Sequence, residues 1–240
     1  MADVVAALSY AKRQWPVIPL HTMDDGACTC GSECSSPAKH PRNPHGLSEA
    51  STDAAIIQGW WDQWPDSNIG IATGQASGLL VVDVDRKSGG LESWAALQDI
   101  HGPVNTLEAV TGGGGNHYLF AANGHQLRNT AGQLGQGIDT RGEGGYIVVS
   151  PSLHASGEHY AWENHIADLT ALPDWLYRLW AHPVKATTID ADATANVEGW
   201  VSDLLRTGTS EGNRNQCVHK LAGYFVRNHI DIPTIRAILE

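Results

Sequence analysis

Two aspartates near the middle of the chain have a spacing that suits metal-assisted chemistry. Asp83 and Asp85 end the apolar run LLVVDVD, and residues two apart in a β-strand project from the same face. Their carboxylates are hard oxygen ligands that suit Mg²⁺ or Mn²⁺, and two such ions can hold both the attacking and the leaving oxygen of a phosphoryl-type displacement. The structural alternative is that one aspartate ends the strand and the other caps the next turn.

A histidine, a third aspartate and an arginine follow in patterns that suit nucleotide binding. TGGGGNHYLF places His117 at the start of a strand after four glycines, where the backbone can approach a phosphate closely. In GIDTRGEGGYIVV, Asp139 ends another predicted strand, and Arg141 has the side-chain geometry to bind a triphosphate. A buried core histidine and an ordinary hairpin loop are the alternatives for His117 and the glycines.

The segment 21–50 is rich in Gly, Ser, Pro, Cys and His and shows no hydrophobic periodicity, so something other than an apolar core must hold it. Soft thiolates and an imidazole within 13 residues predict a tetrahedral Zn²⁺ site. The predicted ligands are Cys28, Cys30, Cys34 and His40.

Other arrangements of this segment stay open. His21 and His45 are the substitutes if His40 is not the fourth ligand. Disulfides are the alternative to a metal, but three cysteines leave one unpaired, and the fourth, Cys217, is distant in sequence. The cytoplasm, where we expect the protein, also keeps thiols reduced.

Hydrophobic periodicity predicts the elements that must position these residues. Helices are expected at 3–14, 51–64, 90–100 and 173–180, and strands at 17–20, 68–73, 78–85, 106–111, 116–122, 145–151 and 159–164. The runs 68–73 and 78–85 are separated only by GQASG, so they are expected to be neighbouring central strands of one sheet. Trp60, Trp61 and Trp64 supply bulk to the buried side of the second helix; stacking on bases is the alternative.

The chain is expected to contain one main domain and a small appendage. We place the domain at 1–185, a linker that lacks periodicity at 186–196, and a helical module at 197–240. The sequence stops within a helical pattern, which suggests a fragment of a longer protein; a naturally short chain is the alternative.

Composition limits the class of protein. No run approaches the roughly 20 apolar residues that span a bilayer, and the start lacks the features of a signal peptide, so a cytoplasmic protein without a membrane partner is expected. The formal net charge of −11 argues against non-specific coating of nucleic acid, which relies on many Lys and Arg at phosphates. A local basic groove remains compatible with that charge.

The order of these motifs resembles a known family. Asp-x-Asp, Gly-Gly-x-His, Ile-Asp-x-Arg-x-x-Gly-Gly-Tyr and Pro-Ser-x-His, with NIGIATG and WWDQWPDSN, resemble the bifunctional primase-polymerase domain of the archaeo-eukaryotic primase superfamily, as found in phage and plasmid replication proteins. The resemblance runs over roughly residues 5–180. It implies an α+β fold with an N-terminal α/β unit, an RRM-like antiparallel sheet carrying the three aspartates, and a small C-terminal helical module.

The resemblance also implies roles for particular residues. Two catalytic Mg²⁺ or Mn²⁺ ions would be held by Asp83, Asp85 and Asp139. His117 would contact the incoming nucleotide, whose pocket would be lined by Arg141, Ser150 and His154. Family members often have Asp-x-Glu at the first motif, so the shorter Asp85 puts the metal preference in doubt.

A lysine beside the cysteines is implicated in the same way. Related phage proteins carry a similar Cys-rich insertion ending in Lys-His-Pro, which supports the zinc site and implies that Lys39 lies near the cleft and reaches a phosphate. A solvated lysine is the alternative.

The resemblance implies a DNA primase and DNA polymerase, a nucleotidyltransferase that uses NTPs or dNTPs on a single-stranded DNA template with a primer. A helicase domain or protein is the expected further partner. The alternatives are a catalytically inactive replication-origin or single-stranded-DNA-binding module and a metal-dependent nuclease. A glycosyltransferase also uses Asp-x-Asp, but the motifs of His117 and Asp139 give it no support.

Overall fold

The structure, a computed structural model, describes residues 4–165, 168–182 and 221. Contacts divide the chain into two units, 1–183 and 184–240, and the description below concerns the first. This unit combines antiparallel sheets with four helices, so it has the mixed α and β composition expected of an α+β fold.

Part of the predicted domain organisation falls outside the described residues. The linker at 186–196 and the helical module at 197–240 lie there, apart from Leu221, so both stay predictions. Within the part of the chain that the structure describes, none of the helices is both long and apolar enough to cross a lipid bilayer.

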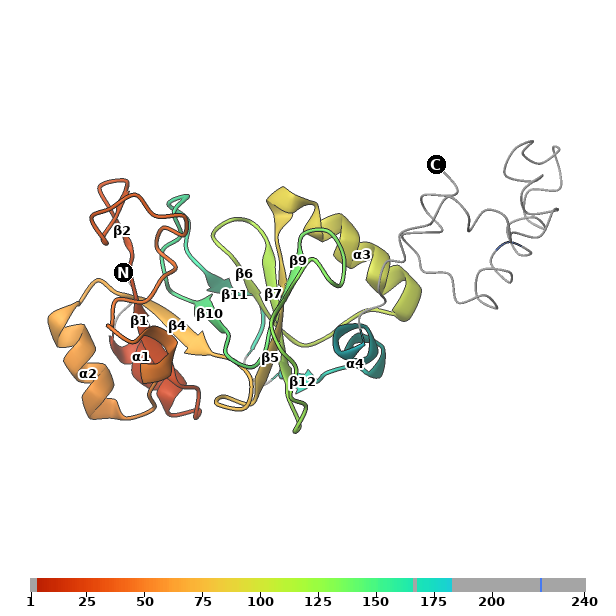
Figure 1. Ribbon diagram of the computed structural model, residues 1–240, viewed down its shortest axis with the longest axis horizontal. Coiled ribbons are helices and arrows are strands. Elements are labelled where there is room, and N and C mark those ends of the chain that lie inside the picture. The colour runs from red at the N-terminus through yellow and green to blue at the C-terminus, as the bar shows by residue number, and fades with distance from the viewer. Residues whose placement is uncertain (1–3, 166–167, 183–220, 222–240) are drawn as a thin grey trace. The chain divides into compact units, whose positions relative to one another are not determined.

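Two separate sheets form the framework (Figure 1). The smaller is antiparallel, in the order β1 (Val17–Leu20), β4 (Asn68–Ala72), β10 (Tyr146–Val149). The larger has the order β11 (Ala161–Trp162), β6 (Leu107–Val110), β7 (Asn116–Ala121), β5 (Leu79–Val84), β9 (Ile138–Arg141), β8 (Thr130–Ala131). The short β12 (Thr170–Ala171) pairs with β7 in parallel, and β2 (Met23–Asp24) and β3 (Ala27–Cys28) form a hairpin of their own.

The four helices predicted within the main domain are present, with bounds within a few residues of those expected. They are α1 (Val4–Ala11), α2 (Ala54–Gln63), α3 (Gly90–His101) and α4 (Asp174–Ala181). Two 3₁₀ turns, η1 (Gly46–Glu49) and η2 (Arg86–Ser88), complete the described helical elements. The short strands β2, β3, β8 and β12 were not predicted, because two-residue pairings leave no periodicity in the sequence.

Strand β5 lies between two hydrophobic cores, because successive side chains of a strand point to opposite faces. Leu79 and Val81 pack into a core with α1, α2 and one face of the smaller sheet. Leu80, Val82 and Val84 pack into a second core with residues of α3 and α4. These five side chains are fully buried, which explains why the run reads as continuously apolar until Asp83 interrupts it.

The prediction that 68–73 and 78–85 are neighbouring strands of one sheet is wrong. β4 pairs with β1 and β10, whereas β5 pairs with β7 and β9. The connection turns sharply through Gly74 and Gly78, both with positive φ, and carries the chain from one sheet to the other. Buried apolar runs report burial on both faces but not the identity of the partner strand, so the sequence could not reveal this separation.

Helix α2 has a side-chain cap at its start. Asp53 accepts hydrogen bonds from the backbone N–H groups of Ala55 and Ile56, at 2.7 and 3.2 Å. The helix then buries Ile57 and Trp61 in the core beside the smaller sheet. The cap therefore stabilises the helix that supports one wall of the molecule.

Substituting Asp53→Ala should lower the free energy of unfolding by about 1 kcal/mol, because two N–H groups at the helix start lose their acceptor. Urea denaturation followed by tryptophan fluorescence measures the change. The control is Gln63→Ala at the exposed end of the same helix, which should unfold like the parent protein. Equal stability of the two variants would contradict a capping role for Asp53.

Candidate active site between the two sheets

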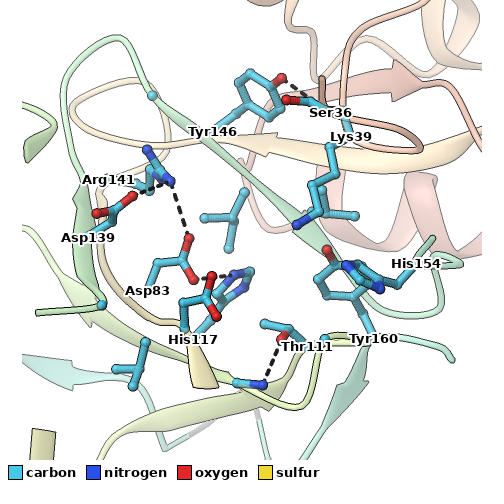
Figure 2. Close-up of a pocket in the computed structure, with 18 of the residues that line it drawn as sticks. Ser36, Lys39, Asp83, Thr111, His117, Asp139, Arg141, Tyr146, His154 and Tyr160 are labelled. Carbon is cyan, nitrogen blue, oxygen red and sulfur yellow. Dashed lines mark hydrogen bonds and ion pairs between the residues drawn. The ribbon is translucent and has the colours of Figure 1, made fainter. Parts of the chain in front are cut away.

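The register of three adjacent strands aligns the predicted site residues. Asp83 in β5 lies directly opposite His117 in β7 and directly opposite Asp139 in β9. Residues paired in this way project from the same face of a sheet, with Cβ atoms about 5 Å apart. The Asp83 Oδ1 atom lies 3.5 Å from the His117 Nε2 atom, as Figure 2 shows.

Arg141 joins the two carboxylates. Its Nη2 atom lies 3.3 Å from Asp83 Oδ2 and 3.1 Å from Asp139 Oδ2. Burial raises the pKa of the Asp83 carboxyl, but attraction to His117 and Arg141 outweighs this effect and lowers the pKa to about 2. Asp83 is therefore a carboxylate at every pH at which the protein would work.

These residues face a cavity of about 540 Å³ that lies between the two sheets. One wall is formed by β5, β7 and β9, and the other by Tyr146, Ile147 and Val148 of β10. The tip of the 21–50 loop contributes Ser36 and Lys39. The volume lies in the range of about 300–1,000 Å³ that is usual for small-molecule sites, so a nucleoside triphosphate can fit.

The four glycines form a tight turn at the floor of this cavity. Thr111 N–H donates to the Gly115 carbonyl at 2.8 Å, and the Thr111 hydroxyl accepts from Gly115 N–H at 3.1 Å. A Cβ atom at Gly115 would lie 2.1 Å from the carbonyl oxygen of Val84, the last residue of β5. At Gly113, which lines the cavity, the nearest atom would be 3.6 Å away. Gly115 is thus needed for packing, and Gly113 leaves the cavity open.

Asp85 has a structural role in the turn that follows β5. It lies just beyond the end of β5, and its Oδ1 atom accepts a hydrogen bond from Lys87 N–H at 2.7 Å. Asp85 thus caps η2, as the structural alternative for this motif expects. It nevertheless lines the cavity and is exposed there.

The structure separates the three remaining predicted nucleotide residues. Lys39 and His154 line the cavity. Ser150 is not among the described residues that do so; its carbonyl oxygen accepts a hydrogen bond from the Tyr10 hydroxyl at 2.7 Å. Burial, followed by the charges of Lys39 and Lys87, lowers the pKa of His154. These basic groups therefore lie close enough to affect one another on one side of the cavity.

Two tyrosines of the cavity were missed by the sequence analysis. Tyr160 is buried, its ring centre lies 6.0 Å from those of both His117 and His154, and burial, together with the charge of Asp83, raises its pKa. The Tyr146 hydroxyl donates to the Lys39 carbonyl oxygen at 2.9 Å. Strand alternation could have indicated Tyr146, but Tyr160 lies outside any strand and carries no signal of its own.

The predicted zinc ligands come together in the 21–50 loop. We call Cys28, Cys30, Cys34 and His40 the metal cluster; one ligand atom from each lies within 4.8 Å of all the others. The Cys28 Sγ and His40 Nε2 atoms are 3.5 Å apart, as two ligands of a tetrahedral zinc ion are, at about 3.5 Å. The cluster therefore fits a metal ion such as Zn²⁺.

The chemistry of the thiols supports a cation there. The three cysteines are free, and desolvation with the neighbouring thiols of Cys28 and Cys30 raises the pKa of Cys34 to about 11. Three thiolates this close need a cation to offset their charge. His21 instead packs against His40, with ring centres 4.5 Å apart and the rings tilted, and its Nδ1 atom hydrogen-bonds the Thr29 hydroxyl. Of the three candidate histidines, His40 is the one within the cluster.

Residues 7–175 match the sequence profile of the Prim-Pol family, described as bifunctional DNA primase/polymerase, N-terminal. The chain belongs to this family. A search of curated proteins found no relative of the chain at the sequence level. The family match confirms the predicted resemblance to primase-polymerase domains.

Membership in the Prim-Pol family indicates the kind of reaction that the cavity serves. Prim-Pol enzymes are metal-dependent nucleotidyltransferases of the primase/polymerase type, whose substrates are DNA and nucleotides. The match covers both the segment with the metal cluster and the strands with Asp83, His117 and Asp139. The cavity is accordingly the candidate active site of this Prim-Pol domain.

Substituting Gly115→Ala should destabilise the domain by about 1–3 kcal/mol, because the new methyl group would overlap the Val84 carbonyl oxygen, a backbone atom that cannot rotate away. Gly113→Ala in the same turn is the matched control and should unfold like the parent. Thermal unfolding of both variants measures the difference. If Gly115→Ala were as stable as Gly113→Ala, the close packing of the turn against β5 would be incorrect.

Proposed function

We propose that this chain synthesises nucleic acid strands on a single-stranded DNA template, as a primase-polymerase of the archaeo-eukaryotic primase superfamily. The observation that carries the proposal is the register that aligns His117, Asp83 and Asp139 beside a cavity large enough for a nucleotide. The larger antiparallel sheet, with α3 and α4 on one face, is compatible with the RRM-like sheet of that superfamily. The smaller sheet with α1 and α2 is compatible with its N-terminal unit.

The carboxylates of the cavity fit divalent cations. Asp83 and Asp139 are hard oxygen donors that already share one cation, the Arg141 guanidinium. Asp85 can join them by rotating its side chain, at the expense of its hydrogen bond from Lys87 N–H. We therefore assign two Mg²⁺ or Mn²⁺ ions to these three aspartates. When bound, the ions would lower the pKa of a primer 3′-hydroxyl and offset charge on the departing pyrophosphate.

The other residues of the cavity bind and orient the nucleotide. His117, held by Asp83 at its Nε2 atom, lies at the floor near the glycine turn, where it can contact a phosphate. The planar guanidinium of Arg141 suits phosphate oxygens as well as carboxylates, so it could move from the carboxylates to a triphosphate oxygen if metal ions were bound. Lys39 and Lys87 add positive charge to the cavity, near His154.

The setting that the family resemblance implies is replication of phage or plasmid DNA, with a helicase domain or protein as a further partner. Template contacts would be made chiefly to the phosphate backbone, because a replicative enzyme must accept any sequence. The formal net charge of −11 means that such contacts must come from local basic groups and bound cations rather than from the overall charge.

A strand-synthesis assay tests the proposal. The full chain is incubated with single-stranded DNA, Mg²⁺ or Mn²⁺, and labelled NTPs or dNTPs, with and without a primer, and products are resolved by length. Unprimed products are expected of a primase, and extended primers of a polymerase. Absence of both from folded protein would favour a binding module, and shortened DNA would favour a nuclease.

Substituting Asp83→Asn should reduce nucleotide incorporation by about 100-fold or more, because the side chain keeps its shape but loses the charge that holds a cation. Asp99→Asn, at an exposed position of α3, is the control and should retain full activity. Initial rates of primer extension measure both variants, and circular dichroism verifies their folding. Full activity in folded Asp83→Asn would remove the carboxylate from the mechanism.

A further inference from the structure

One short segment belongs both to the metal cluster and to the wall of the cavity. His40 is a member of the cluster, and the N–H group of Ala38 donates to Cys28 Sγ at 3.5 Å. Lys39 lies between these two residues and lines the cavity, together with Ser36. The backbone of Lys39 is therefore held from both sides by groups that depend on the cluster.

The same loop segment is hydrogen-bonded to two neighbouring strands of the smaller sheet, β4 and β10. The Tyr146 hydroxyl of β10 donates to the Lys39 carbonyl oxygen at 2.9 Å, and the Asn68 side chain of β4 donates to the Ala38 carbonyl oxygen at 3.0 Å. Ala38 is fully buried and has a φ of +62°, a conformation that alanine rarely adopts. Such a conformation persists only where the surroundings impose it, so the geometry of this segment depends on its attachments.

The side chain of Lys39 then reaches into the cavity. Figure 2 shows it entering from the loop, across the cavity from Asp139 and Arg141. Lys39 and Lys87 both act on His154 electrostatically, which places the ammonium group near the basic side of the site. An incoming triphosphate, held at its other end by cations on Asp83 and Asp139, would find its counter-charge there.

We propose that the metal cluster positions Lys39 so that its ammonium group binds the phosphates of the incoming nucleotide, which makes nucleotide affinity depend on the metal of the loop. This inference rests on the proposed function. It assigns to a cluster remote from the reacting atoms a positioning role in substrate binding, because the cluster residue His40 directly follows Lys39 in the chain.

The physical reason is the entropy of the loop. Without the metal, residues around Cys28–Cys34 lose their cross-links, and a lysine carries several rotatable bonds of its own. An ammonium group that samples a large volume spends little time near the triphosphate. If the backbone of Lys39 is fixed before the nucleotide binds, less conformational entropy is lost in the binding step.

Equilibrium binding of a nucleoside triphosphate to the full chain tests this dependence. Titrations with a dNTP and Mg²⁺, without DNA, compare the parent with Lys39→Ala, Cys34→Ser and the double variant. Each single variant should bind the dNTP about tenfold more weakly, as expected for loss of one charge-assisted contact. The double variant should be no weaker than either single variant, because both changes remove the same contact.

Matched controls separate this effect from general damage. Lys12→Ala removes an exposed lysine of the same domain, and Ser35→Ala alters an exposed residue of the same loop; both should bind the dNTP like the parent. Lys39→Ala should keep its full content of metal, measured by elemental analysis, whereas Cys34→Ser should lose it. Binding of the unphosphorylated nucleoside should not change in Lys39→Ala, because the lost contact is to phosphate.

A further variant covers the case in which Cys34→Ser does not fold. Tyr146→Phe removes the hydrogen bond to the Lys39 carbonyl oxygen and leaves the metal ligands intact, so it should also weaken dNTP binding. Unchanged dNTP affinity in Lys39→Ala, or additive losses in the double variant, would overturn the inference. A parent protein that binds no dNTP and makes no product would instead refute the proposed function itself.

Discussion

The pairing of β5 with β7 and β9 is the constraint on which the site depends. A shift of one residue in either pairing would turn Asp83 away from His117 or Asp139, because neighbouring residues of a strand face opposite sides. Burial on both faces of β5 opposes such a shift. Leu80 and Val82 fill one core and Leu79 and Val81 fill the other, so a slip would place Asp83 in an apolar environment and cost several kcal/mol. Ordinary core packing thus determines the geometry of the chemistry.

Charged side chains of both signs line the cavity. Asp83 and Asp139 lie close together on the larger sheet, where their mutual repulsion is offset by the guanidinium of Arg141. Lys39 and Lys87 also line the cavity, near His154. The cavity therefore offers both groups suited to a cation and groups suited to an anion.

Local patterns in the sequence were sufficient for most elements and for the centre of the site, but not for the relations between them. The apolar run before Asp83 and the glycines before His117 marked β5 and β7 correctly, and the spacing of cysteines marked the metal cluster. The separation of β4 from β5 into different sheets could not be seen, since both are buried on two faces. Asp85 was placed in the strand because an Asp-x-Asp spacing does not reveal that the strand ends one residue earlier.

The 21–50 loop shows why a metal ion would be useful at this place. Its wall of the cavity must be polar, so the loop cannot be held by burying apolar side chains toward the substrate. Polar contacts of Arg42 hold one side of the loop. Its guanidinium donates hydrogen bonds to both carboxylate oxygens of Asp66, at 2.7 and 2.9 Å, and to the Thr29 hydroxyl, at 2.7 Å. The metal cluster, whose Cys28 and Cys30 flank Thr29, would hold the tip of the loop. A structural zinc ion contributes about 10–16 kcal/mol of apparent binding free energy in small peptides, far more than a few exposed side chains could provide. A metal cross-link would leave Lys39 facing the cavity on a backbone that has little freedom to move.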